Sequence, residues 1–236
     1  MGGLIDAASA ILSSSTRRLE MVSNNVANAV TPGYKRQLSF THSLEQASAA
    51  DQVQEVLARA DIGQGKISPS ANPLDLAIDG EGFFQIMAGG DLRYTRQGQF
   101  RVADDGTLIT PAGHRLQQAG GGDLVVRGSA IEITGDGTLL EDGRPTARIG
   151  LYAPAEAAQL QPASGSLFAF GLAGPREVSR PQIRQGALET SNVTLGDEMV
   201  SMMAALRQAE SGARLVQVYD DLLGRAISTF GQGSGR

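Results

Sequence analysis

Both ends of the chain carry apolar residues at alternating gaps of three and four, and this spacing restricts the fold more than any other feature. Near the N-terminus the repeat consists of Ile5, Ala8, Leu12, Ser15, Leu19, Val22 and Val26. The spacing is that of an a/d seam lasting about three heptads, which is near the minimum for a coiled coil. A helix with one apolar stripe and an otherwise polar surface is unstable alone in water, so this helix needs a partner.

The C-terminal region offers that partner, because the same spacing returns there. The second repeat consists of Leu195, Met199, Met202, Leu206, Ala209, Ala213, Val216, Asp220, Leu223, Ile227 and Phe230. Two such seams, one at each terminus, suggest that the ends pack together as a coiled coil. Two amphipathic helices lying separately on a globular core would show the same spacing, so the pattern alone leaves both structures open.

Two seam positions are polar. If the helices run antiparallel, Ser15 falls roughly opposite Ala209 and Ala213, where small residues allow a close approach. Asp220 would be costly if it were buried without a partner, so we expect it to face solvent, a basic side chain or another subunit.

The first helix should end near Asn28, because the Thr31-Pro32-Gly33 segment cannot continue it. Asn24 and Asn28 are four residues apart and share a face. They are typical either of an asparagine-capped helix end or of a polar contact surface for a neighbouring chain, and spacing favours the capped end.

Between the terminal helices the pattern changes to period two, with short apolar segments separated by turn residues. Asp-Gly turns between such segments predict a ladder of hairpins. The expected strands lie at residues 74–78, 83–87, 93–95, 99–102, 107–110, 124–126, 131–133 and 147–152. Asp105-Gly106-Thr107-Leu108 is echoed by Asp136-Gly137-Thr138-Leu139, which we interpret as reuse of one hairpin turn. Residues 165–181 read as a long surface loop.

These patterns predict an α+β protein in which N- and C-terminal helices form a coiled-coil core domain, with an irregular antiparallel β domain between them. The expected parts are an N-terminal core helix over 1–35, a linker or extended segment over 36–66, a β domain over 67–184, and a C-terminal core helix and tail over 185–236. Residues 46–60 fit either a polar helix or a linker. Ser191 or Asn192 should lie at the N-cap of the last helix, and residues 231–236 should be disordered.

Composition and motifs argue against several classes of function. The chain has no cysteine and therefore no thiolate metal site or cysteine nucleophile. Its net charge of -5 and the lack of basic runs do not favour nucleic acid as a partner. No stretch is long and apolar enough for a transmembrane helix, and the first residues lack the features of a cleaved signal peptide. The two histidines, His42 and His114, have no metal-ligand spacing, and we expect no catalytic residue, cofactor or metal.

Three blocks of the sequence resemble the signatures of bacterial flagellar rod and hook proteins. Residues 24–36 (NNVANAVTPGYKR) are similar to the N-terminal signature of that family. Residues 72–84 (NPLDLAIDGEGFF) and 94–100 (YTRQGQF) are similar to the shared β-domain signature. Residues 185–193 (QGALETSNV), with Glu198-Met199-Val200 beyond them, are similar to the C-terminal signature. The blocks stand in family order and span nearly the whole chain.

The resemblance implies a structural subunit of the flagellar basal-body rod that stacks helically, transmits motor torque and is not an enzyme. Its partners would be copies of itself, other rod subunits and the flagellar export apparatus, which would export it without cleavage to the periplasmic rod. Length favours the proximal rod subunit with one β domain, and the distal rod subunit is the alternative. The residues expected in the coiled coil or in assembly are Ile5, Leu12, Leu19, Val22, Val26, Leu195, Met199, Met202, Leu206, Val216, Leu223 and Ile227. The residues expected at inter-subunit contacts are Asn24, Asn28, Thr31, Gly33 and Tyr34.

A different class of function, a ligand-binding or enzymatic β domain with helical extensions, would need a deep polar pocket containing His114 and paired carboxylates. An unrelated coiled-coil adhesin would leave the three ordered blocks unexplained.

Overall fold

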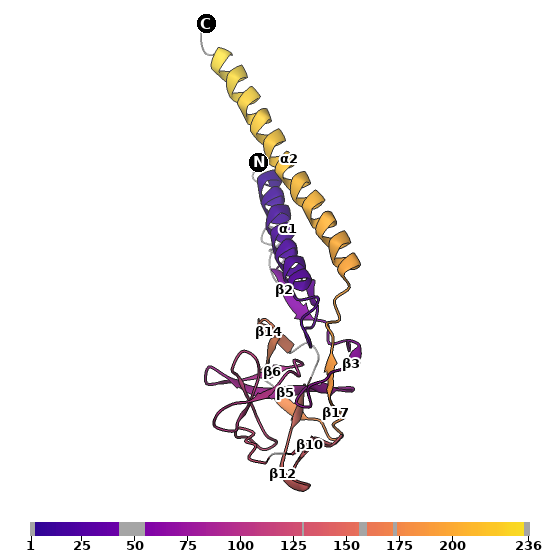
Figure 1. Cartoon of the computed structure of the whole chain (residues 1–236). Coiled ribbons are helices and arrows are strands. Elements are labelled where there is room, and N and C mark those ends of the chain that lie inside the picture. The colour runs from indigo at the N-terminus through magenta and orange to yellow at the C-terminus, as the bar shows by residue number, and fades with distance from the viewer. Residues whose placement is uncertain (1–2, 43–54, 129, 156–159, 172–173, 234–236) are drawn as a thin grey trace. The chain divides into compact units, whose positions relative to one another are not determined.

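The computed structural model describes residues 3–42, 55–128, 130–155, 160–171 and 174–233 (Figure 1). It begins with helix α1 (Gly3–Ala27), ends with helix α2 (Leu195–Gly233), and has a mostly antiparallel β region between them. The predicted α+β class is confirmed. Contacts divide the chain into two units: residues 1–26, 39–57 and 194–236 form unit 1, and residues 27–38 and 58–193 form unit 2.

The strands are short, as expected for a turn-rich chain. They are β1 (Gln37–His42), β2 (Glu55–Ala60), β3 (Ile67–Pro69), β4 (Leu76–Ile78), β5 (Phe83–Ala88), β6 (Asp91–Thr95), β7 (Arg101–Val102), β8 (Leu108–Ile109), β9 (Arg115–Leu116), β10 (Ile131–Ile133), β11 (Thr138–Glu141), β12 (Arg144–Arg148), β13 (Leu151–Pro154), β14 (Leu160–Ser164), β15 (Leu167–Phe170), β16 (Pro175–Glu177), β17 (Ile183–Gln185) and β18 (Ala187–Glu189).

The largest sheet of unit 2 contains several hairpins, as the Asp-Gly turns predicted. Its strand order is β14-β15-β6-β5-β9-β8-β7, and β13 joins it by pairing with β5 and β16. A three-stranded sheet has the order β10-β11-β12. Two small sheets, β17-β4 and β18-β3, pair strands from distant parts of the sequence. They bring the segment before α2 alongside residues 67–78.

The apolar residues of these strands form one main core and a smaller aromatic cluster. The core includes buried Leu, Ile and Val side chains from all along unit 2, together with Phe84 and Phe100. In the smaller cluster Tyr94 stacks on Phe170 with ring centroids 3.8 Å apart. Burial of each large apolar side chain stabilises the folded state by about 1.5–3 kcal/mol.

The two Asp-Gly-Thr-Leu segments adopt the same turn, so the interpretation of their echo is confirmed. In each, the aspartate carboxylate accepts the backbone N–H of the following threonine, at 3.0 Å for Asp105 and 3.3 Å for Asp136. Each leucine is buried, and the flanking strands pair in the same register. The shared sequence therefore encodes a shared local structure.

Several boundaries differ from the sequence-based expectation. Residues 165–181 are not one long loop: they contain β15 and β16, because Phe168 is buried in the aromatic cluster. Residues 124–126 form only an isolated bridge, and residues 147–152 are divided between β12 and β13. Residues 231–233 are helical instead of disordered, while residues 234–236 and 43–54 lie outside the described part of the chain.

Candidate assembly site

The two terminal helices pack against each other within unit 1. The amide of Asn25 on α1 donates to the carboxylate of Glu198 on α2 at 3.1 Å. Gly212 on α2 lies against the side chains of Ile11 and Leu12 on α1. Moving back along α1 from Asn25 to Ile11 therefore corresponds to moving forward along α2 from Glu198 to Gly212. The helices run antiparallel, as Figure 1 also shows, and α2 continues beyond the N-terminal end of α1.

The face of α1 turned inward is the one predicted by the heptad spacing. Ala8, Ser15 and Val22 are buried, and Leu12, Leu19 and Val26 are partly buried, whereas Ile5 near the free end is exposed. The Ser15 hydroxyl donates to the Ile11 carbonyl at 2.7 Å, which satisfies its polar group inside the pair.

On α2 the residues buried against α1 differ in part from the predicted seam, because every second seam position is shifted by one residue toward the N-terminus. The buried residues are Glu198, Ala205 and Gly212, each seven positions after the last. Met202 and Ala209, which lie between them, and Val216, which follows Gly212, are partly buried, as predicted. Of the predicted positions, Leu195, Met199, Leu206 and Leu223 are exposed, as is Asp220. The reason is steric: Ala205 and Gly212 let α1 approach closely, and the neighbouring large residues do not. The side chain of Ile227 lies outside the described residues.

Glu198 and Asn25 form a buried polar pair at one end of this helix pair, and each is about 1% exposed. Moving Glu198 out of contact with Asn25 would leave buried polar atoms to be satisfied elsewhere. The pair therefore favours one direction and one register of α1 on α2, as single polar residues do in coiled coils.

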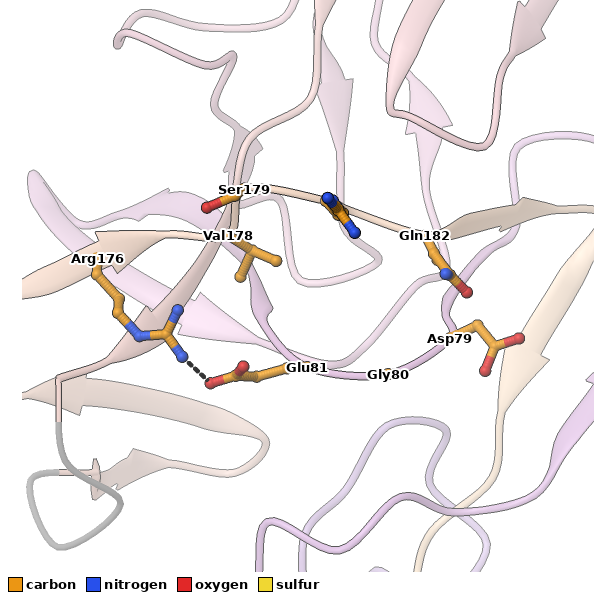
Figure 2. Close-up of a pocket in the computed structure, with 8 residues that line it drawn as sticks. Asp79, Gly80, Glu81, Arg176, Val178, Ser179 and Gln182 are labelled. Atoms are coloured by element: carbon orange, nitrogen blue, oxygen red, sulfur yellow. Dashed lines mark hydrogen bonds and ion pairs between the residues drawn. The ribbon is translucent and has the colours of Figure 1, made fainter.

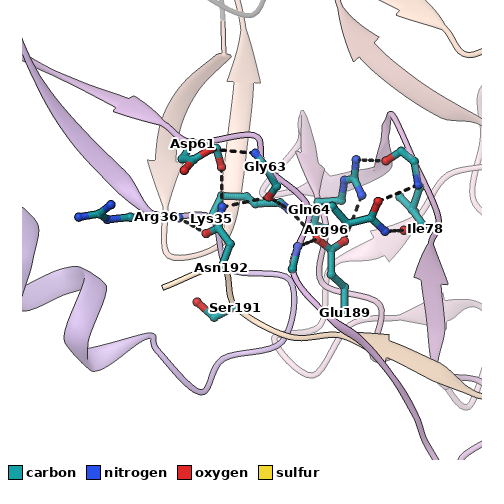
Figure 3. A network of polar contacts seen from close by, with 12 residues as sticks. Lys35, Arg36, Asp61, Gly63, Gln64, Ile78, Arg96, Glu189, Ser191 and Asn192 are labelled. Carbon is teal, nitrogen blue, oxygen red and sulfur yellow. Dashed lines mark hydrogen bonds and ion pairs between the residues drawn. The ribbon is translucent and has the colours of Figure 1, made fainter. Parts of the chain in front are cut away.

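A second cluster lies in unit 2, where the segments that follow α1 and precede α2 meet (Figure 3). We define the Glu189 cluster as Lys35, Arg96 and Glu189, all three of them buried. The Glu189 carboxylate accepts Lys35 Nζ at 2.6 Å and an Arg96 guanidinium N–H at 3.0 Å. It also accepts the backbone N–H of Gly65 at 2.8 Å. One carboxylate thus joins three distant segments of the chain.

Backbone hydrogen bonds around the cluster tie the same segments together. The Gly33 N–H donates to the Glu189 carbonyl at 2.8 Å, and the Asn192 side chain accepts the Arg36 N–H at 2.7 Å. Gly33 has a φ of +69°, and a Cβ there would lie 2.2 Å from the Arg96 carbonyl oxygen. Only glycine fits at this position, because any side chain would clash with backbone.

The electrostatics of the cluster are those of two buried cations sharing one carboxylate. Burial lowers the pKa of Lys35 below its ordinary value, although Glu189 opposes that effect. Burial also lowers the pKa of Arg96, again opposed by Glu189. The Arg96 guanidinium lies 5.2 Å from the centre of the Phe83 ring and donates to the Gly80 carbonyl at 2.6 Å. Glu189 is therefore the group that makes burial of both cations tolerable.

The described part of unit 2 also has an open surface pocket of about 460 Å³ (Figure 2). Its acidic residues are already engaged, because Glu81 pairs with Arg176 and Asp79 pairs with Arg184. His114 does not line it. The pocket thus lacks the histidine and free carboxylates that the enzyme or ligand-binding alternative required.

Across the described ranges, no three potential His, Cys, Asp or Glu ligands come together as a metal site. Within those ranges, no helix has the length and hydropathy needed to cross a bilayer.

The residues predicted at inter-subunit contacts fall into two groups. Asn24 is exposed, and Asn28 and Thr31 are partly buried and hydrogen bonded to each other. Gly33 and Tyr34 are buried inside unit 2, so their packing is with their own chain.

The signature blocks contain Lys35, Arg96, Glu189 and Glu198. The sequence pattern assigns no role to the first three, and for Glu198 it predicts only a favourable place near the positive end of the last helix. The available signal was a charged residue inside each block. Charged residues are usually exposed. Here each one is buried together with a polar or oppositely charged partner, which accounts for its presence inside a block.

Comparisons with known proteins fit this arrangement. Residues 1–35 match a family model described as flagella basal body rod protein. Residues 77–142 match the flagellar hook protein FlgE/F/G D1 domain, and residues 184–229 match the C-terminal region of flagellar basal body rod FlgEFG proteins.

Whole-chain relatives agree with the three models. The flagellar basal-body rod protein FlgF of Caulobacter vibrioides is 30% identical over 227 residues, covering 92% of this chain and 93% of the relative. FlgG of Bacillus subtilis is 28% identical over 247 residues, covering 89% and 92%. FlgF of Salmonella typhimurium is 30% identical over 226 residues, covering 87% and 89%. The chain therefore belongs to the family of flagellar basal-body rod proteins.

Proposed function

We propose that this chain is a structural, non-enzymatic subunit of the flagellar rod, with the proximal FlgF-type subunit as the first assignment and the FlgG-type distal subunit as the alternative. The match to Caulobacter FlgF over nearly the full length of both chains supports this reading. The structural observation that carries it is the row of large apolar side chains left exposed on α2. A soluble monomer rarely leaves such a row uncovered, whereas a subunit of an assembly covers it with its neighbours.

In this proposal the terminal helices build a coiled-coil core from several copies. Leu12, Leu19, Val22, Val26, Met202 and Val216 belong to the pairing of α1 with α2 inside one chain. Ile5, Leu195, Met199, Leu206, Leu223 and Ile227 belong to contacts with neighbouring subunits. Asn24, Asn28 and Thr31 add polar contacts, while Gly33 and Tyr34 act indirectly by fixing the backbone next to them.

The Glu189 cluster suits a mechanical role. It ties the two segments that lead to the terminal helices to each other and to Arg96 of the β region. Strain arriving along either segment would be resisted by buried charge-assisted hydrogen bonds, which are stronger than neutral ones. This supports transmission of torque by the assembled subunit.

Export belongs to the same proposal. The subunit would leave the cell through the flagellar export apparatus without cleavage and join the rod in the periplasm. Terminal helices that gain order only when neighbours cover their apolar rows would suit that route.

Complementation tests the function. We expect the chain to restore swimming and to appear in purified basal bodies when it replaces the FlgF-type subunit of a related bacterium. Leu206→Asp should abolish both, because it places a charge in the exposed apolar row. If the chain is expressed and soluble but absent from basal bodies, the proposal is wrong.

Circular dichroism provides a separate test in solution. The helical signal should grow with protein concentration, and removal of residues 1–30 should eliminate that growth. A monomer that is fully helical at every concentration and never associates would contradict the proposal.

A further inference from the structure

Two segments of unit 2 meet at the Glu189 cluster, and each also has contacts of its own with the β region (Figure 3). We call residues 33–36, which follow α1, the N-segment, and residues 183–192, which precede α2, the C-segment. The order in which they dock follows from what each one leaves behind when the other is absent.

The C-segment keeps most of its contacts when the N-segment is taken away. Strand β17 still pairs with β4, and β18 still pairs with β3. Ile183 stays in the main core, and the Glu189 carboxylate retains the Arg96 guanidinium and the Gly65 N–H. Lys35 would move into water, so one cation and one carboxylate would remain in the cluster. This state buries no charge without a counter-charge.

The N-segment loses backbone anchors when the C-segment is taken away. The Gly33 N–H donates to the Glu189 carbonyl at 2.8 Å. The Arg36 N–H donates to the Asn192 side chain at 2.7 Å. Both acceptors belong to the C-segment, so the N-segment cannot make these bonds before the C-segment is in place.

The charges of the cluster point the same way. Without Glu189, a docked Lys35 would have the Gly63 carbonyl as acceptor but no carboxylate, and it would stand beside the buried Arg96. Two like charges in a buried site disfavour each other, and burying them without a counter-charge is costly. Docking of the N-segment therefore depends on Glu189, whereas docking of the C-segment does not depend on Lys35.

We infer that unit 2 closes in a fixed order, in which the C-segment docks on the β region first and the N-segment docks last. This inference goes beyond the proposed function and does not rest on it. The N-segment precedes the rest of unit 2 in the chain, yet it stays undocked until residues near the far end of unit 2 are in place. In the folded protein the N-segment can open alone, but every opening of the C-segment includes an opening of the N-segment.

Native-state hydrogen exchange of the full chain, resolved by residue, tests this order because each local opening exposes its own amides. The N-segment amides are those of Gly33 and Arg36. The C-segment amides are those of Ile183, Gly186 and Thr190, whose acceptors all lie outside the N-segment. After correction for intrinsic rates, we expect the N-segment amides of the natural chain to exchange at least tenfold faster than the C-segment amides.

Two substitutions separate the two openings. Gly33→Ala brings a Cβ against the Arg96 backbone and weakens docking of the N-segment. It should speed exchange of Arg36 and of the C-segment amides by the same factor, because both openings include release of the N-segment. Gln185→Ala removes side-chain hydrogen bonds to two backbone carbonyls of the β region. It should speed exchange of the C-segment amides alone. Gly89→Ala, at a positive φ with open space around it, is the control and should change neither group.

Three results would overturn the inference. The C-segment amides of the natural chain could exchange faster than the N-segment amides, which would reverse the order. Gln185→Ala could speed exchange of Gly33 and Arg36. Gly33→Ala could speed exchange of Arg36 and leave the C-segment amides at their natural rates, which would show two independent openings. These measurements use the free chain without any flagellar partner, so failure of the docking order and failure of the rod function are distinguishable.

Discussion

Replacing Glu189 with glutamine is the most direct perturbation of the Glu189 cluster. Glu189→Gln keeps the size of the side chain but removes the only charge that balances Lys35 and Arg96 inside the cluster. A glutamine can still accept one hydrogen bond, yet its amide N–H₂ would face a buried cation. The variant therefore tests charge balance with little change in packing.

The size of the effect follows from the burial of all three groups. Their side chains are between 0% and 4% exposed, so water cannot screen or solvate the remaining cations. Removing one partner from a buried ion pair costs about 3–5 kcal/mol. At a urea dependence of about 2 kcal/mol per molar, that loss lowers the unfolding midpoint by about 2 M.

Tyrosine fluorescence during urea unfolding is a suitable assay. Three of the four tyrosines, Tyr34, Tyr94 and Tyr152, lie in unit 2, and the chain has no tryptophan. The matched control is Asp79→Asn, which breaks the exposed pair with Arg184 at 2.5 Å. That pair is solvated, so its loss should cost at most about 1 kcal/mol.

A second substitution separates charge from shape. Adding Lys35→Met to Glu189→Gln removes one of the two unbalanced cations, and we expect the double variant to be more stable than Glu189→Gln alone. If Glu189→Gln destabilises unit 2 no more than Asp79→Asn does, buried charge balance is not what holds these segments together.

Three further predictions concern other contacts. Gly212→Leu should lower the helical signal and the melting temperature, because a Cβ at this position lies 3.1 Å from the side chains of Ile11 and Leu12. Gly224→Leu is the control and should lower neither, because a Cβ there has no atom within 4 Å. Equal behaviour of the two variants would contradict the pairing of α1 with α2. Gly33→Ala should lower the free energy of unfolding by at least about 2 kcal/mol more than Gly89→Ala does. Both glycines have positive φ, but only at Gly33 would the added Cβ meet a backbone oxygen. Urea titration of both variants measures the difference. Burial raises the pKa of Tyr94 above 10.0, so its contribution to stability is present below pH 10 and is lost as the pH rises through the higher folded value. Tyr94→Phe should remove that loss in unfolding experiments between pH 9 and 11, and an unchanged slope would refute it.

Sequence patterns were most informative where a local rule applied. The end of α1 at Ala27 follows from Thr31-Pro32-Gly33, and the repeated Asp-Gly-Thr-Leu turn follows from residues adjacent to one another. The split of residues 165–181 into β15 and β16 was missed, because Phe168 is placed by the distant Phe83 and Tyr94. The long-range strand pairs β17-β4 and β18-β3 carry no local signal either.

By itself the sequence determined that this chain has helices at both ends, a hairpin-rich region between them and the signature blocks of a rod protein, because periodicity and turn chemistry act between near neighbours. Only the tertiary structure decided which face of α2 packs on α1. The spacing is compatible with two neighbouring faces of the helix, and the small residues Ala205 and Gly212 lie on the face that packs because they allow the closer approach. The tertiary structure also decided that Lys35, Arg96 and Glu189 share one buried site. That result depends on segments more than 90 residues apart meeting in space, which no local pattern encodes.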